Sequence, residues 1–197
     1  MAINRTPILK RCRSLELEPA FLGVNKKSNR KPIHNARKVS EYALQLREKQ
    51  KAKFVYGVQE KPFRNLYEKA SRMQGLVGPN LMTLLELRLD NIIFRMGFAR
   101  TRREARQVVS HRHVLVNGKI VNIPSYKVEV GDTIEIKEKS KSLQRFKDIV
   151  EVTGGYAVPA WMEANTDTLS GKILEKPLRE QIDTPVNETL IVELYSK

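Results

Sequence analysis

The sequence predicts an α+β fold, in which a helical region precedes a small unit of two helices and a twisted β-sheet. Three observations predict it. Apolar residues between positions 40 and 96 recur at the three- and four-residue spacing of amphipathic helices. Residues 133–137 alternate polar and apolar, as a half-buried strand does. Residues 1–38 show little periodicity and are interrupted by Pro7, Pro19, Gly23 and Pro32, which indicates an extended arm without a packed core of its own.

Charge is the strongest compositional signal. The 197 residues include 36 Lys and Arg against 22 Asp and Glu, a net charge of +14, which favours a polyanionic partner. Residues 1–64 hold 16 basic and 5 acidic residues, whereas from Asp148 onward acids outnumber bases by 9 to 4. We therefore expect RNA to bind at the basic end and a basic protein to contact the acidic tail.

Several functional classes are disfavoured. No apolar run is long enough to span a bilayer and no charged-then-apolar leader is present, so we expect no membrane association. Cys12 is the single cysteine and cannot form a disulfide within the chain. We find no nucleophile–base pair, glycine-rich phosphate loop or cluster of metal ligands, and so predict neither an enzyme nor a cofactor.

Three helices are expected before residue 87. The first follows Ser40, a favourable N-cap, through SEYALQLREKQKAKFVYGV and carries a lysine-rich stripe. The second spans about 61–74, and the third is expected to be capped by Asn80.

The stretch from 85 to 137 organises the chain. One apolar helix face is given by Leu85, Leu89, either Ile92 or Ile93, and Met96, and Gly97 ends the helix. A second helix is then predicted through Arg112, because Thr101 and Glu104 have the spacing of a capping box. Ala105, Val108 and Val109 share one face of this helix, and Arg102, Arg103 and Arg106 lie on another face.

A small β-unit and a C-terminal region follow. Asn117-Gly118 predicts a two-residue hairpin turn, and residues 133–137 a further strand. Beyond a polar link at 139–142 we expect a helix over 143–152 and a loop with a hairpin over 156–176, which turns at Ser170-Gly171.

A fork of arginines on a compact scaffold favours nucleic-acid binding, because guanidinium groups bind phosphate oxygens bidentately. The arginines alone leave a solvated basic helix face as an equal alternative.

Three segments resemble one family, that of ribosomal small-subunit protein number four: RLDNIIFRMGFARTRREARQVVSHRHVLVNGKIVNIPSYKVEVGD, SEYALQLREKQKAKFVYGV and IVELYSK. The resemblance implies a basic extended arm at 1–38 and a helical first domain at 39–86 plus 177–197. An RNA-binding domain at 87–176, with its core module at 87–150, would interrupt the first domain.

The resemblance also implies a function. A member of this family is a structural constituent of the small ribosomal subunit in the cytoplasm, and binds small-subunit rRNA directly and early in assembly. It contacts ribosomal small-subunit protein five at an interface that affects decoding accuracy, and needs no obligate homo-oligomer. A place at the mRNA entry channel and repression of its own operon's mRNA are further traits of the family, and an organellar ribosome stays open.

On this basis we predict two groups of site residues. The candidate RNA-binding residues are Arg5, Arg11, Arg13, Lys26, Lys27, Arg30, Arg37, Lys38, Arg47, Lys49, Lys53, Arg64, Arg72, Arg95, Arg100, Arg102, Arg103, Arg106, His111, Arg112, Asn117 and Lys119. The candidate protein-partner residues are Glu180, Glu188 and Glu193.

No metal site is predicted. Many relatives hold zinc with four N-terminal cysteines, but here Cys12 and the isolated His34 cannot supply the four ligands of structural zinc. The chain therefore resembles the zinc-free form. His111 and His113 lack a third ligand and are expected to have a structural or RNA-contacting role.

Two other classes of function share features with this sequence. Arg88-Leu89-Asp90 is similar to the Arg-Leu-Asp run of pseudouridine synthases, but the chain has no residues left for their catalytic domain, and a salt bridge is the simpler role for Asp90. A free RNA-binding regulator or ribosome-rescue factor would usually lack the basic arm and the helical first domain.

Overall fold

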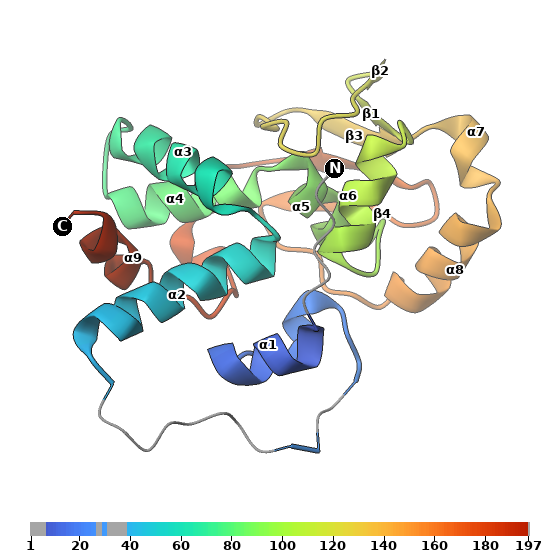
Figure 1. Ribbon diagram of the computed structural model, residues 1–197. Helices are drawn as coiled ribbons and strands as arrows, with labels where there is room; N and C mark the ends of the chain where they lie inside the picture. The colour runs from blue at the N-terminus through green and yellow to red at the C-terminus, as the bar shows by residue number, and fades with distance from the viewer. Residues whose placement is uncertain (1–6, 27–28, 31–38, 197) are drawn as a thin grey trace. The chain divides into compact units, whose positions relative to one another are not determined.

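The computed structural model describes residues 7–26, 29–30 and 39–196, and its fold is α+β as predicted (Figure 1). Contacts divide the chain into two compact units. Unit 1 comprises residues 1–65 and 184–197, and unit 2 comprises residues 66–183. The predicted domain boundaries at 86/87 and 176/177 remain a proposal. None of the described helices is both long and apolar enough to cross a membrane.

Unit 1 is helical. Its described elements are α1 (Ile8–Leu15), η1 (Pro19–Leu22), α2 (Glu41–Tyr56), the first half of α3 (Glu60–Ser71) and α9 (Glu188–Tyr195). The Ser40 hydroxyl accepts a hydrogen bond from the backbone N–H of Ala43, which confirms the predicted cap of α2. In the core of the unit, the Tyr56 hydroxyl lies 3.1 Å from the Thr184 hydroxyl.

Part of the N-terminal arm is folded, so the expectation of an arm without a packed core is wrong for residues 7–26. Ile8, Cys12 and Leu15 have helical spacing, and Cys12 and Leu15 are buried in α1. Pro7 precedes this helix as its N-cap residue rather than breaking it. Residues 1–6, 27–28 and 31–38 of the predicted arm lie outside the described chain.

Unit 2 contains the rest of α3, a run of further helices and a five-stranded antiparallel sheet. The helices are α4 (Val77–Glu86), α5 (Leu89–Arg95), α6 (Arg102–Ser110), α7 (Glu138–Lys141), α8 (Gln144–Thr153) and η2 (Arg179–Gln181). The strands are β1 (Val114–Val116), β2 (Lys119–Ile120), β3 (Thr133–Ile136), β4 (Met162–Asn165) and β5 (Ser170–Ile173), in the spatial order β2-β1-β3-β5-β4. Buried apolar residues of α5, α6, α8 and the sheet form one core, which holds α6 firmly in place.

The two hairpins of the sheet test two predictions. Asn117 and Gly118 have φ values of +50° and +73°, which confirms the predicted two-residue turn between β1 and β2. Ser170-Gly171 is not a turn, because both residues lie inside β5. A Cβ on Gly171 would lie 2.5 Å from the Glu163 carbonyl oxygen and 2.9 Å from the Met96 methyl carbon, so close packing requires this glycine.

Two helix starts differ from prediction. The third helix, α4, begins at Val77 and not after Asn80, whose side-chain amide instead donates to the Gln74 carbonyl oxygen at 3.1 Å. The expected apolar helix face from Leu85 to Met96 is divided between α4 and α5. The break occurs because the N–H of Leu89 donates to the Tyr126 carbonyl oxygen, outside the helix.

Three smaller details of the helices also differ from the sequence predictions. The polar link at 139–142 contributes to the short helix α7. α6 ends at Ser110 rather than at Arg112. The Thr101 hydroxyl caps α6 as predicted, but the Glu104 carboxylate accepts from the N–H of Arg100 and not from that of Thr101, so the capping box is not reciprocal.

Candidate nucleic-acid interface

The three arginines predicted on one face of α6 have different environments. Ala105, Val108 and Val109 are buried in the core of unit 2, and this fixes which side of the helix faces water. Arg103 is exposed, and Arg106 is half-buried. Arg102 is only 9% exposed, so the predicted fork of three consists of one exposed, one half-buried and one buried arginine.

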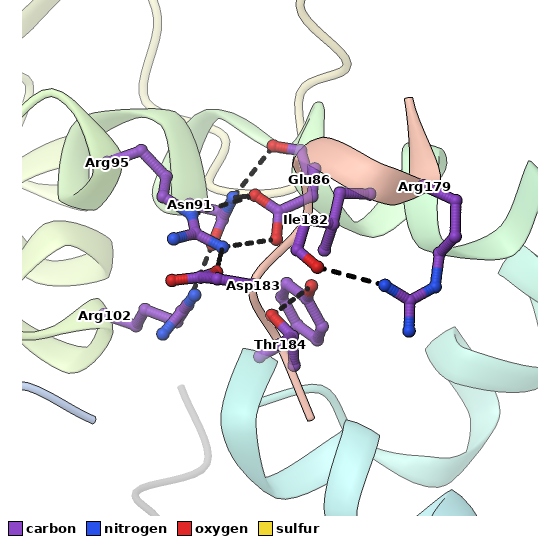
Figure 2. Close-up of polar contacts among 9 residues, drawn as sticks. Glu86, Asn91, Arg95, Arg102, Arg179, Ile182, Asp183 and Thr184 are labelled. Atoms are coloured by element: carbon purple, nitrogen blue, oxygen red, sulfur yellow. Dashed lines mark hydrogen bonds and ion pairs between the residues drawn. The ribbon is translucent and has the colours of Figure 1, made fainter. Parts of the chain in front are cut away.

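Arg102 belongs to a buried polar network that Figure 2 shows. Its Nε donates to Asn91 Oδ1 at 2.8 Å, and its guanidinium lies 4.3 Å from the centre of the Phe94 ring. Asn91 Nδ2 donates in turn to Glu86 Oε2 at 2.7 Å. The network therefore joins the start of α6 to α5 and α4.

Arg95 completes this network from α5. It donates to both carboxylate oxygens of Glu86, at 3.1 and 2.9 Å, and to Asp183 (Figure 2). Burial would lower the pKa of Arg95, but the charges of Glu86 and Asp183 outweigh burial and raise it. Glu86 is fully buried, so its carboxylate needs these donors. Arg95 and Arg102 are thus both occupied inside the protein.

A second buried ion pair supports Arg106. Arg88 donates from Nε to Asp90 Oδ1 at 3.0 Å and from Nη2 to Oδ2 at 2.7 Å, a bidentate pair in which both side chains are about 5% exposed. Arg106 Nη2 lies 3.3 Å from the same Oδ2. The predicted salt bridge of Asp90 is confirmed, and the same carboxylate also contacts the half-buried Arg106 of α6.

Arg112 follows α6 in a conformation that favours glycine. Its φ is +63°, its N–H donates to the Val109 carbonyl oxygen, and the next N–H, of His113, donates to Val108. These two bonds form a Schellman motif, in which the left-handed position is usually glycine. A left-handed residue with a side chain costs roughly 1–2 kcal/mol. An exposed arginine kept at such a cost is consistent with a contribution to binding.

The remaining residues near α6 divide into exposed side chains and side chains with structural contacts. Lys119 and His111 are exposed, and Arg100 is exposed while paired with Glu104. His113 Nδ1 lies 2.9 Å from the Ser140 hydroxyl, and burial together with the nearby His111 lowers its pKa. Asn117 donates to Asp132 Oδ1 and accepts from the Thr133 N–H, so its side chain links the hairpin to β3.

We define the α6 surface as the exposed or half-buried side chains of Arg103, Arg106, His111, Arg112 and Lys119. Among the described residues, Arg103, Arg112 and Lys119 have no acidic partner. These side chains can therefore bind an anion without first breaking an ion pair. Arg72, on the α3–α4 connection of the same unit, is also exposed.

Most of the predicted RNA-binding residues of unit 1 that are described have partners within the protein. Arg47 pairs with Glu16, and Lys49 and Lys53 both pair with Glu60, at 2.9 and 2.6 Å. Arg11 donates to Gln50 Oε1 at 3.2 Å. Lys26, Arg30 and Arg64 are exposed, and Arg13 is half-buried. Arg5, Lys27, Arg37 and Lys38 lie outside the described residues.

The predicted protein-partner residues are divided between the two units. Glu180 is exposed on η2 of unit 2, whereas Glu188 begins α9 of unit 1. Glu193, also on α9, accepts a hydrogen bond from Gln45 Nε2 at 3.1 Å, so one of its oxygens is occupied within unit 1.

No metal centre is found among the described residues, where no three His, Cys, Asp or Glu side chains converge. Cys12 is buried, which raises the pKa of its thiol, and His34 lies outside the described range.

Known proteins match the whole chain. The S4 domain family matches residues 87–134, and the ribosomal protein S4/S9 N-terminal domain family matches residues 4–86. Small ribosomal subunit protein uS4 of Lachnospira eligens is 67% identical over 197 residues, with all of both chains covered. The uS4 proteins of Agathobacter rectalis and Fusobacterium nucleatum are 66% and 51% identical, again over the full length of both chains. These relatives are ribosomal proteins rather than enzymes, as predicted. The chain therefore belongs to the family of the bacterial small ribosomal subunit protein uS4.

Proposed function

We propose that this protein is a structural constituent of the small ribosomal subunit in the cytoplasm, and that it binds small-subunit rRNA directly. The family supports the first part of the proposal, since its full-length relatives carry that name. The α6 surface supports the second, because it presents several cations without acidic partners in the described chain on a rigid helix and hairpin.

The chemistry of the α6 surface suits phosphate more than base edges. Arginine side chains present planar forks of N–H donors that match phosphate oxygens. Folded RNA is recognised mainly through its shape, its phosphates and its 2′-hydroxyls, since the narrow major groove hides the base edges. We therefore expect binding to depend on the fold of an rRNA junction, with little reading of individual bases.

Salt dependence tests this mechanism. Neutralising several phosphates releases counterions, so affinity for a transcript of the small-subunit rRNA should fall by roughly 10³-fold between low and moderate salt. Filter binding or fluorescence anisotropy over a salt series measures this. A flat response would contradict the mechanism. In a cell lysate the protein should sediment with the small subunit at stoichiometric levels, whereas a modification enzyme or regulator would not.

We further propose that the acidic residues near the C-terminus contact ribosomal small-subunit protein five, and that this contact contributes to decoding accuracy. Glu180 supports this, as an exposed carboxylate in a region where acids outnumber bases. Reversing Glu180 and Glu188 to lysine should weaken binding to protein five and leave rRNA affinity unchanged. Equal loss of both would argue against separate surfaces. A place at the mRNA entry channel and control of its own operon are further proposals from the family, which translation and reporter assays would test.

A further inference from the structure

One carboxylate of unit 2 lies between two arginines from different elements. Glu104 Oε1 is 3.2 Å from Arg100 Nη2, and 3.3 Å from both Nη2 and Nε of Arg145 on α8. Arg145 Nη2 also donates to Gln107 Oε1 at 3.2 Å. Two residues of α6, one turn apart, thus hold a guanidinium that belongs to α8.

The exposures of these side chains are unequal. The side chain of Glu104 is 12% exposed, whereas those of Arg145 and Arg100 are 33% and 46% exposed. Burial raises the pKa of Glu104, but the hydrogen bonds of Arg100 and the charge of Arg145 lower it below its usual value. The carboxylate is therefore ionised at neutral pH and lies beneath two cations that face solvent.

Both guanidiniums keep donors for a further ligand. Each uses Nε and Nη2 for its contacts with α6, and no described residue accepts a hydrogen bond from Nη1 of either. Holding long side chains in place before binding removes part of the entropy that a complex would otherwise lose. The group is an ordered cation pair with free donors, which is the arrangement that an anion with several oxygens requires.

We propose that Arg145 and Arg100, positioned by Glu104 and Gln107, form a binding site for RNA backbone phosphate. Arg145 lies beyond residues 87–134, which the S4 domain family matches, so the RNA-binding surface extends onto α8. This inference rests on the proposed function. Sequence reasoning missed Arg145, because only the packing of α8 brings it beside Glu104.

Substitution of Arg145 tests the site in the full-length protein, with transcribed small-subunit rRNA as the probe. Arg145→Gln should lower affinity about fivefold to tenfold and reduce the slope of log affinity against log salt by about one. Lys147→Gln is the matched control, because this exposed lysine is on the same helix but on another face, and it should change affinity by less than twofold. Equal effects of the two variants would overturn the proposal.

Two further variants separate positioning from simple charge. Arg145→Lys keeps the charge but loses the planar fork, and should still lose part of the affinity. Glu104→Gln removes the charge that holds both arginines. It should weaken binding to the rRNA while leaving or raising affinity for an unrelated RNA duplex. The affinity for rRNA divided by the affinity for the duplex should therefore fall. A rise in affinity for both RNAs would show that Glu104 only offsets charge, and would contradict its positioning role.

A third measurement identifies which claim fails. Arg103 belongs to the α6 surface and not to this site, so Arg103→Gln tests the α6 surface alone. If Arg103→Gln weakens binding and Arg145→Gln does not, the extension onto α8 is wrong and the proposed function stands. If the unaltered protein shows no steep salt dependence, the proposed function itself fails.

Discussion

Two basic helices, α2 in unit 1 and α6 in unit 2, have similar compositions but different surroundings. On α2, Lys49 and Lys53 are held by Glu60, their side chains are 13% and 14% exposed, and Lys49 also lies 5.3 Å from the centre of the Tyr195 ring. On α6, Arg103 is exposed and has no acidic partner in the described chain. The first helix uses its cations to join α2, α3 and α9, and the second presents cations to solvent.

We infer from this difference that a cation whose donors are all held by acids is a weaker candidate for RNA binding than one that keeps donors free. The same contrast recurs within α6 itself, where Arg102 donates to Asn91 inside the protein and its neighbour Arg103 faces water. Unit 1 carries much of the positive charge of the chain, yet the described cations of α2 that we predicted to bind RNA are already paired. We therefore propose that the stronger RNA contacts of the described chain lie on unit 2.

The largest expected effect is on stability. Arg95→Gln leaves the buried carboxylate of Glu86 without its main partner, and should destabilise unit 2 by about 3 kcal/mol or more. Urea unfolding followed by the fluorescence of Trp161, which is buried in unit 2 and is the single tryptophan of the chain, measures this. If the variant kept its stability but lost RNA affinity, Arg95 would be an RNA contact and the contrast between inner and outer arginines would fail.

The next effect is on affinity. Replacing both Arg103 and Arg106 by glutamine should weaken rRNA binding by about tenfold or more, since each loses a charged contact with phosphate. Stability should change little for Arg103, and somewhat more for Arg106, whose removal also takes a cation from Asp90. Full affinity in the double variant, measured by anisotropy at fixed salt, would remove α6 from the interface.

Arg112→Gly should separate binding from stability. Glycine accepts a φ of +63° without strain, so the free energy of unfolding should rise by up to about 1 kcal/mol. Affinity for rRNA should fall a few-fold, because an exposed cation of the α6 surface is lost. Thermal unfolding measures the change in stability, and binding titrations of the same preparation measure the change in rRNA affinity. A fall in stability would show that the arginine side chain has structural contacts worth more than its strain.

The smallest effect concerns α2. Burial raises the pKa of Glu60, but hydrogen bonds from Lys53 and Lys49 outweigh it and lower the pKa to about 2. The pair therefore stabilises unit 1 above the unfolded pKa of Glu60, and this contribution is lost as pH falls from about 4.5 to about 2. Glu60 is half exposed, so solvent screening limits the contribution to under about 1 kcal/mol. Hydrogen exchange of α2 and α3 should lose this pH dependence in Glu60→Gln.

Local patterns predicted much of the fold. Ser40 and Thr101 cap α2 and α6, and Asn117-Gly118 turns the first hairpin, since each depends on neighbouring residues alone. The break between α4 and α5 could not be predicted, because carbonyl groups more than 30 residues away accept the N–H groups of Leu89 and Asp90. Gly171 was misread for a similar reason, since Met96 approaches it from another element.

The site was predicted less completely than the fold. Charge and spacing identified α6, but not the burial of Arg102 or the acids that pair with Arg95. One signal was present, because Glu86 lies in the apolar run LMTLLELRL, and a carboxylate in such a run implies a buried partner. Arg145 carried no such signal, since its contact with Glu104 spans 41 positions of the chain.

One paired measurement tests the central claim, that Arg103 and Arg106 of α6 rather than Lys49 and Lys53 of α2 bind rRNA. It compares two double variants that remove the same charge, one with both Arg103→Gln and Arg106→Gln and the other with both Lys49→Gln and Lys53→Gln. The quantity compared is the slope of log rRNA affinity against log salt. The α6 variant should lose about two units of slope, and the α2 variant less than about half a unit. Equal losses, or a larger loss for α2, would contradict the claim.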